Sequence, residues 1–380
     1  MIDSDLTSKS IIGSFWSIIE KIGVQSIKVV ILIILARLLG PEEFGLIAII
    51  MFLFTIAQIF VEAGFTQAYI QKKKISDIDS NTVFYSNFLI SLIFYFFVYL
   101  LAPIISEFYN QPKLIDLIRV TGIILIINSF YFIQNAILTK QINFKKKAKI
   151  TLLSSFLSGI ISIYLAYINF GVWSLVFHII LNKLFLTIGL WLTSNWKPKL
   201  QFSFKSLNNL FSFGSWILLS SLFKSFSDNL YILFIGKVYS IYDLGLYNKS
   251  KQIPLLISAQ ATSAIALVAF PIFSKLQNNN KEFRKKFSDF LFYSFALISP
   301  FLVVLIVISE SFVILVLTEK WLDIIPYLRI VAFNAILYPI HAINVQSLIA
   351  KGYSRLNFRI EFIKNILRFF NIFITYKYGI

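Results

Sequence analysis

Long apolar segments alternate with short polar connections along the whole chain. Each segment is close to the ~20 residues that an α-helix needs to cross a hydrocarbon core of about 30 Å. The pattern therefore predicts an all-α polytopic membrane protein with about eleven transmembrane helices. The expected spans are residues 11–34, 45–70, 82–105, 114–138, 150–168, 172–193, 209–235, 252–273, 287–308, 325–350 and 360–376.

Basic residues concentrate on alternate connections between these spans. Of the 35 Lys and Arg residues, 20 lie on one side and 7 on the other, the remainder falling within or beside spans. The side with 20 basic residues comprises the amino terminus through Ser10 and residues 71–81, 139–149, 194–208, 274–286 and 351–359. By the positive-inside rule this side is cytoplasmic, so the amino terminus is predicted to lie in the cytoplasm.

Composition agrees with a membrane protein and excludes several other classes. Hydrophobic residues make up 58% of the chain, more than a soluble core can bury. The net charge of +17 is explained by cytoplasmic loops that face anionic lipid headgroups, so no nucleic acid partner is expected. The chain has no cysteine and only two histidines, which lie in different halves, and it lacks nucleotide-binding motifs. We therefore expect neither a metal site nor a cofactor.

The chain resembles itself at an offset of 200 residues. Trp16 aligns with Trp216, and R-L-L-G-P-E-E-F-G-L from Arg37 aligns with K-V-Y-S-I-Y-D-L-G-L from Lys237. Two halves in the same order predict parallel repeats, an arrangement in which transporters place the substrate site at the repeat interface. We expect two pseudo-symmetric lobes: residues 1–200 with six helices and residues 201–380 with five. Chance similarity between hydrophobic sequences is the alternative.

Charged residues inside the spans are the candidate functional groups, because each costs roughly 2.5–3.5 kcal/mol at the bilayer centre. Glu20 and Lys28 lie on one face of the first span, and Lys224 and Asp228 lie on the face of the seventh span that corresponds to it at the 200-residue offset. If the halves face each other, both stripes line one hydrated cavity. Lys224 and Asp228 also have the i, i+4 spacing of an ion pair that only neutralises itself, and both interpretations stay open.

Two further charged residues lie deep in spans. Glu62 precedes Gly64, where helices can approach closely, and its carboxylate would either carry a coupling proton or pair with Lys28 or another basic residue. Arg368 shares a helix face with Glu361 and Lys364 and is the strongest candidate for an anion ligand. Interhelical hydrogen bonding is the favoured role for the remaining polar residues, His178, Asn182, Lys183, Asn334, His341 and Asn344.

Several motifs resemble a known family. They are G-S-F-W at 13–16, L-A-R-L-L-G-P-E-E-F-G-L at 35–46, E-A-G-F-T-Q-A-Y-I-Q at 62–71 and F-P-I-F-S-K-L at 270–276. The chain resembles the polysaccharide-biosynthesis flippases of the multidrug/oligosaccharidyl-lipid/polysaccharide exporter superfamily, in particular the lipopolysaccharide, teichuronic-acid and colanic-acid exporter type. The resemblance implies two six-helix lobes, often followed by two further helices. Against this 12–14-helix fold, we expect the chain to be truncated after Ile380, which puts its activity in doubt.

The resemblance also implies a function. Relatives move polyprenyl-pyrophosphate-linked oligosaccharides across the cytoplasmic (inner) membrane by alternating access. Lys28, Lys224 and Arg368 would then bind the pyrophosphate, and Glu20, Glu62 and Asp228 would be cavity or coupling carboxylates. We expect a monomer and not an enzyme, while the glycan and any H⁺ or Na⁺ coupling stay open. The alternatives are a cation-coupled drug antiporter of the same superfamily and an integral membrane glycan polymerase or glycosyltransferase.

Overall fold

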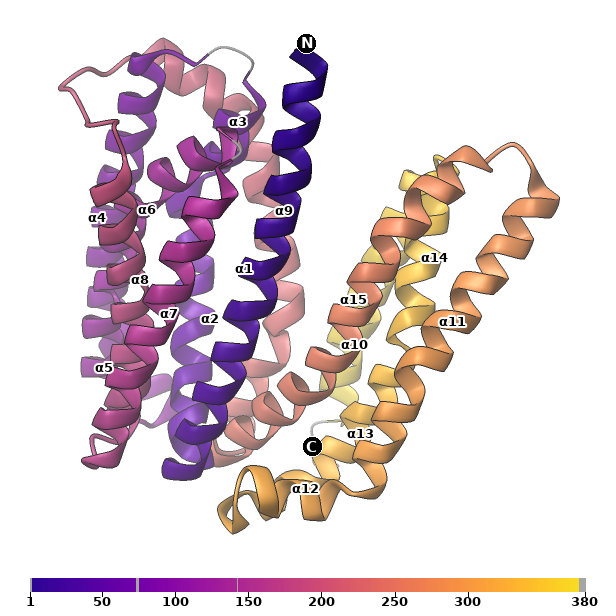
Figure 1. Ribbon diagram of the computed structural model, residues 1–380. Helices are drawn as coiled ribbons and strands as arrows, with labels where there is room; N and C mark the ends of the chain where they lie inside the picture. The colour runs from indigo at the N-terminus through magenta and orange to yellow at the C-terminus, as the bar shows by residue number, and fades with distance from the viewer. Residues whose placement is uncertain (1, 73–74, 142, 376–380) are drawn as a thin grey trace. The chain divides into compact units, whose positions relative to one another are not determined.

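The computed structural model describes residues 2–72, 75–141 and 143–375, which form fifteen α-helices, one 3₁₀ helix and no strand (Figure 1). The helices of the first half are α1 (Ile2–Leu38), α2 (Pro41–Glu62), α3 (Phe65–Gln71), α4 (Asp77–Tyr109), α5 (Leu114–Thr121), α6 (Ile123–Lys140), α7 (Phe144–Tyr167) and α8 (Val172–Thr193). Those of the second half are α9 (Phe204–Val238), α10 (Ile241–Lys275), α11 (Asn280–Val307), α12 (Ser309–Val316), η1 (Glu319–Ile324), α13 (Ile325–Ile336), α14 (Tyr338–Ala350) and α15 (Ser354–Thr375).

All the predicted apolar segments lie in helices, within the described residues. Seven helical segments, counted over that part of the chain, are long and apolar enough to cross a membrane. The other four predicted spans, which correspond to α1, α9, α10 and α15, are helical as well. The all-α membrane fold is confirmed, while the number of eleven crossings stays a prediction.

Three predicted spans are interrupted rather than continuous. The breaks fall at Ala63–Gly64, at Gly122 and at Leu337. Ala63 and Gly64 have φ values of 45° and 69°, a left-handed conformation that glycine adopts freely and alanine adopts only with strain. The break ends α2 at Glu62, so this carboxylate lies beside an interruption of the helical backbone.

The described helices pack into two compact units. Unit 1 comprises residues 1–39 and 46–229, and unit 2 comprises residues 40–45 and 230–380. Within α9 the division falls between Asn229 and Leu230. The predicted division into residues 1–200 and 201–380 follows the repeat and stays a prediction.

Unit 1 is held together by close packing around α7. This helix packs against α1 and α8, while α6 packs against α4 and α8 (Figure 1). The buried face of α7 consists of small residues, Ser154, Ser155, Ser158, Gly159, Ser162 and Ala166. Small side chains let helix backbones approach closely, which replaces the hydrophobic driving force that is absent between helices in lipid.

Two glycines of the repeated turn meet in unit 2. A Cβ atom on Gly45 would overlap the carbonyl oxygen of Ile241, and one on Gly245 would overlap that of Pro41. The four positions form two pairs that are each 200 residues apart, so the contact is reciprocal. The start of α2 and the start of α10 therefore cross at a distance that only glycine permits. Beside this crossing, the rings of Phe44 and the fully buried Trp321 lie 5.4 Å apart, edge to face.

Substitution of either glycine tests this crossing. Gly45→Ala or Gly245→Ala should destabilise the protein by about 1–3 kcal/mol, because the new methyl group meets backbone that cannot move aside. Thermal unfolding in detergent measures the effect. Gly40→Ala is the matched control in the same turn, since its Cβ would meet only the flexible Glu43 carboxylate at 3.3 Å. Equal stability of all three variants would contradict the close crossing.

Candidate functional site

Charged side chains from three helices gather inside unit 1. We define the unit 1 polar cluster as Glu20 and Lys28 of α1, Glu62 of α2 and Lys183 of α8. Lys183 lies close enough to Glu62 and Lys28 for their charges to interact. Both acids also lie near Tyr131 of α6, so the four charges are grouped around one part of the unit.

Glu20 is held by a neighbouring helix. The hydroxyl oxygen of Thr151 on α7 lies 3.1 Å from Glu20 Oε1 and 2.9 Å from the carbonyl oxygen of Lys147, and its single proton is shared between these two acceptors. Glu20 is partly buried, whereas Lys28, two turns further along α1, is exposed. The close packing of α1 on α7 thus fixes the carboxylate and leaves the ammonium group of Lys28 accessible.

Lys183 occupies an aromatic and acidic environment. Its Nζ lies 3.8 Å from the centre of the Tyr131 ring, at a distance typical of a cation–π interaction. Glu62, at the end of α2, supplies the nearest opposite charge. Opposite charges attract, so each of Glu62 and Lys183 offsets part of the cost of burying the other.

The rest of this face of α8 bonds to α7. Asn182 Nδ2 lies 3.4 Å from Ser155 Oγ and 3.2 Å from Ser158 Oγ, and His178 Nδ1 lies 3.3 Å from Ser162 Oγ. These contacts agree with the interhelical role that the sequence predicts for Asn182 and His178. They fix the rotation of α8, which directs Lys183 toward Tyr131 and Glu62.

The unit 1 polar cluster contains two ammonium groups and two carboxylates. Such a cluster can bind an anion when phosphate oxygens replace the carboxylates as partners of the lysines. It can also exchange a proton, because each carboxylate has an alternative neutral form. Among the described residues, no group of three or more His, Asp or Glu side chains is placed to hold a metal ion.

The other predicted site residues lie elsewhere. Lys224 and Asp228, one turn apart on α9, belong to unit 1 and are both exposed. Arg368 belongs to unit 2, where its charge interacts with His341 of α14 and Tyr247 of α10. On the same helix, Lys364 Nζ pairs with Glu361 at 2.5 Å, and His341 Nε2 lies 3.4 Å from Glu361. The predicted alignment of Glu361 and Lys364 on one face is confirmed.

Gly64 has the close contact that the sequence predicts. A Cβ atom at Gly64 would overlap Gly214 of α9, and one at Gly214 would lie 2.5 Å from the carbonyl oxygen of Ala63. The break after Glu62 is therefore packed directly against the α9 backbone.

Lys183 is the residue whose importance the sequence analysis underestimated. Its partners Glu62 and Tyr131 lie on other helices, so no spacing along the chain reveals them.

The fold is similar to those of membrane transporters of known structure. A lipid II flippase MurJ in an inward closed conformation matches with a TM-score of 0.72 and 17% identity, over 90% of this chain and 76% of that one. An inward-facing multidrug resistance MATE family transporter matches with a TM-score of 0.64 and 15% identity, over 86% and 80% of the two chains. The chain therefore has the fold of an all-α membrane transporter.

Sequence comparison places the chain within that class. The model of the polysaccharide biosynthesis protein family matches residues 34–326, and the chain belongs to this family. It is 29% identical to the teichuronic acid biosynthesis protein TuaB of Bacillus subtilis, over 93% of this chain and 74% of that protein. It is 26% identical to the lipopolysaccharide biosynthesis protein WzxC of Escherichia coli, over 95% and 74%. The family resemblance drawn from the sequence motifs is confirmed. The prediction that the protein is a transporter and not an enzyme is confirmed with it.

A double-mutant cycle tests the Glu62–Lys183 interaction. Glu62→Gln and Lys183→Gln should each destabilise the protein, while the double variant should be more stable than the sum predicts, by about 0.5–3 kcal/mol. Thermal unfolding in detergent measures all four proteins.

Lys286 and Asp289 provide the matched control. This exposed pair, 3.2 Å apart, should show a coupling near zero. Additive effects at Glu62 and Lys183 would show that the two side chains do not interact.

Proposed function

We propose that the protein is a flippase that moves a polyprenyl-pyrophosphate-linked oligosaccharide across the cytoplasmic membrane for cell-surface polysaccharide synthesis. The observation that carries the proposal is the pair of lysines, Lys28 and Lys183, inside a transporter fold of the polysaccharide biosynthesis family. The names of relatives support it, since TuaB acts in teichuronic acid biosynthesis and MurJ is a lipid II flippase.

The chemistry of the substrate explains the need for intramembrane cations. A pyrophosphate headgroup cannot enter hydrocarbon unaided, because removing water from such a charge is very costly. Lys28, Lys224 and Arg368 replace water around the phosphates, and the polyprenyl tail stays in lipid. Lys183 joins this set, because binding of an anion near the unit 1 polar cluster releases it from Glu62. Alternating exposure of the site to the two membrane faces then moves the headgroup.

Glu20, Glu62 and Asp228 are the proposed cavity and coupling carboxylates. A carboxylate that loses its lysine partner to the substrate gains affinity for a cation, which links substrate binding to uptake of H⁺ or Na⁺. In this proposal the amino terminus lies in the cytoplasm, which is supported by the 20 basic residues predicted on that side of the membrane. The protein acts as a monomer and binds no nucleic acid.

A cation-coupled drug antiporter is the second candidate, favoured by the match to a MATE family transporter and by the two acids near Tyr131, Glu20 and Glu62. The two functions differ in the sign of the substrate charge. A liposome assay with a fluorescent polyprenyl-pyrophosphate oligosaccharide and, separately, a cationic dye distinguishes them. Movement of the lipid alone supports the flippase, and movement of the dye alone supports the antiporter.

Charge neutralisation tests the role of the predicted cations. Lys28→Gln and Arg368→Gln should each slow outward movement of the lipid roughly tenfold or more, because a charge-assisted hydrogen bond contributes about 1.5–3 kcal/mol. Lys286→Gln, in an exposed ion pair, should leave the rate unchanged. If both variants are folded and move the lipid as fast as the wild-type chain and Lys286→Gln do in the same assay, these residues are excluded as phosphate ligands.

A further inference from the structure

The connection between α8 and α9 is bound along its length to the first turns of α4. Lys199 N donates to Asn81 Oδ1 at 3.0 Å, and Ser203 N donates to Thr82 Oγ1 at 3.1 Å. Asn81 Nδ2 also lies 3.3 Å from Gln201 Oε1. Asn81 and Thr82 are fully buried. If the connection only had to link α8 to α9, it would need none of these hydrogen bonds.

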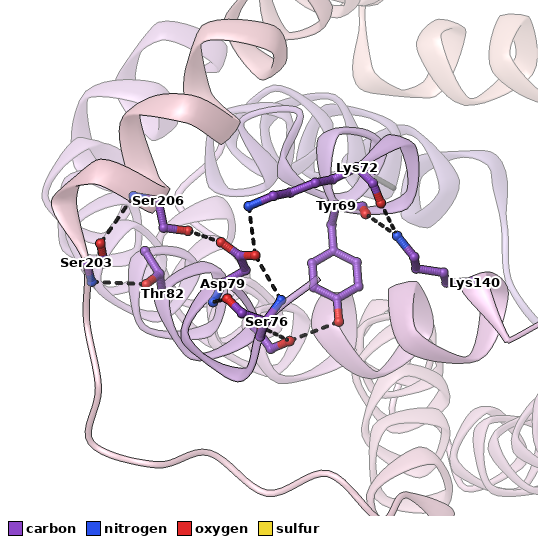
Figure 2. Close-up of polar contacts among 9 residues, drawn as sticks. Tyr69, Lys72, Ser76, Asp79, Thr82, Lys140, Ser203 and Ser206 are labelled. Atoms are coloured by element: carbon purple, nitrogen blue, oxygen red, sulfur yellow. Dashed lines mark hydrogen bonds and ion pairs between the residues drawn. The ribbon is translucent and has the colours of Figure 1, made fainter. Parts of the chain in front are cut away.

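Asp79 is the centre of this attachment (Figure 2). Its side chain is buried, with 4% of the residue exposed, and both oxygens are occupied. Oδ2 accepts from Lys72 Nζ at 2.8 Å and from Ser76 N at 3.0 Å, while Oδ1 accepts from Ser206 Oγ at 2.5 Å. Ser76 and Asp79 form a capping box that begins α4. One carboxylate thus joins the end of α3, the start of α4 and the first turn of α9.

Apolar packing continues the attachment into α9. Leu210 is buried in a core with Phe65 and Phe84, and Leu207 packs against the same core. One turn beyond Leu210, Gly214 meets the backbone of Gly64. The first part of α9 therefore belongs to unit 1 by hydrogen bonds, by core packing and by a backbone contact.

We propose that Asp79 is a positioning residue that fixes the α8–α9 connection and the start of α9 to unit 1, so that Lys224 and Asp228 move together with Glu20, Lys28 and Glu62 during transport. This rests on the proposed function. Asp79 touches no substrate, and it acts through α9. The moving body then includes α9 as far as Asn229, although the repeat divides the chain at residue 200.

Hydrogen exchange tests the attachment without any transport assay. In Asp79→Asn an amide NH₂ group faces the Lys72 and Ser76 donors, so the amides of Lys199 and Ser203 should exchange at least about tenfold faster. Asp79→Glu keeps the charge and the capping box and should restore most of the protection.

Asp77→Asn is the matched control, because Asp77 pairs with Lys199 at 3.2 Å with both side chains about two-thirds exposed (66% and 65%). It should change the exchange little. Unchanged exchange in Asp79→Asn, or equal acceleration in Asp77→Asn, would overturn the proposal.

Cross-linking tests whether the attachment persists during transport. The chain has no cysteine, so Asp77→Cys with Lys199→Cys gives a defined pair on exposed side chains of α4 and of the connection. Joined by a short bifunctional methanethiosulfonate reagent, which forms a disulfide with each cysteine and releases sulfinate, the double variant should move the fluorescent lipid in liposomes at a rate within about twofold of the untreated double variant. Each single-cysteine variant, treated in the same way, controls for modification. Loss of movement on cross-linking, restored by a thiol reductant, would show that the connection must move relative to α4 and would overturn the proposal.

Failure of the proposed function can be distinguished from failure of the proposal about Asp79. A double variant that moves no lipid before cross-linking, beside a wild-type chain that is equally inactive, counts against the proposed function. In that case the exchange measurement alone decides whether Asp79 holds α9.

Discussion

A charged side chain in hydrocarbon costs several kcal/mol unless another group compensates it, and the polar architecture of this chain follows from that cost. The basic residues avoid the spans or gather with partners. Glu20 receives a bond from Thr151, and Lys183 has both Glu62 and the Tyr131 ring. Each partner comes from a different helix, so charge compensation also fixes how the helices of unit 1 are rotated.

The same constraint explains the use of small residues. Helices in lipid gain little from burying apolar side chains against one another, so they must come close enough for backbone contact and hydrogen bonds. The serines of α7 meet both needs, because they permit close packing and accept bonds from Asn182. Gly64 and Gly214 extend this principle to the break after Glu62, where the irregular backbone is covered by α9. Close packing and polar compensation are therefore properties of the same positions.

The sequence predicts the helices well, because length and apolar composition are local properties of the chain. It also predicts that Gly64 is a point of close approach and that Glu361 and Lys364 share a face. It does not predict the break at Ala63, since alanine ordinarily favours a helix and its φ of 45° is imposed by packing. It undervalues Lys183, whose partners come from α2 and α6. Contacts between helices distant in sequence leave no periodic signal.

The two halves predicted from the internal similarity of the sequence and the two compact units of the structure do not divide the chain at the same residues. Residues 40–45 belong to the first half in sequence, but they pack in unit 2, where Gly45 meets Ile241 and Gly245 meets Pro41. The first part of α9 belongs to the second half in sequence, yet Ser206 bonds to Asp79 and Gly214 meets Gly64 in unit 1. Each half thus contributes one segment to the other unit. The chain passes between the units at three places: after Leu39, after Gly45 near the start of α2, and after Asn229 within α9. Any relative movement of the units must therefore be accommodated by the backbone at those three places.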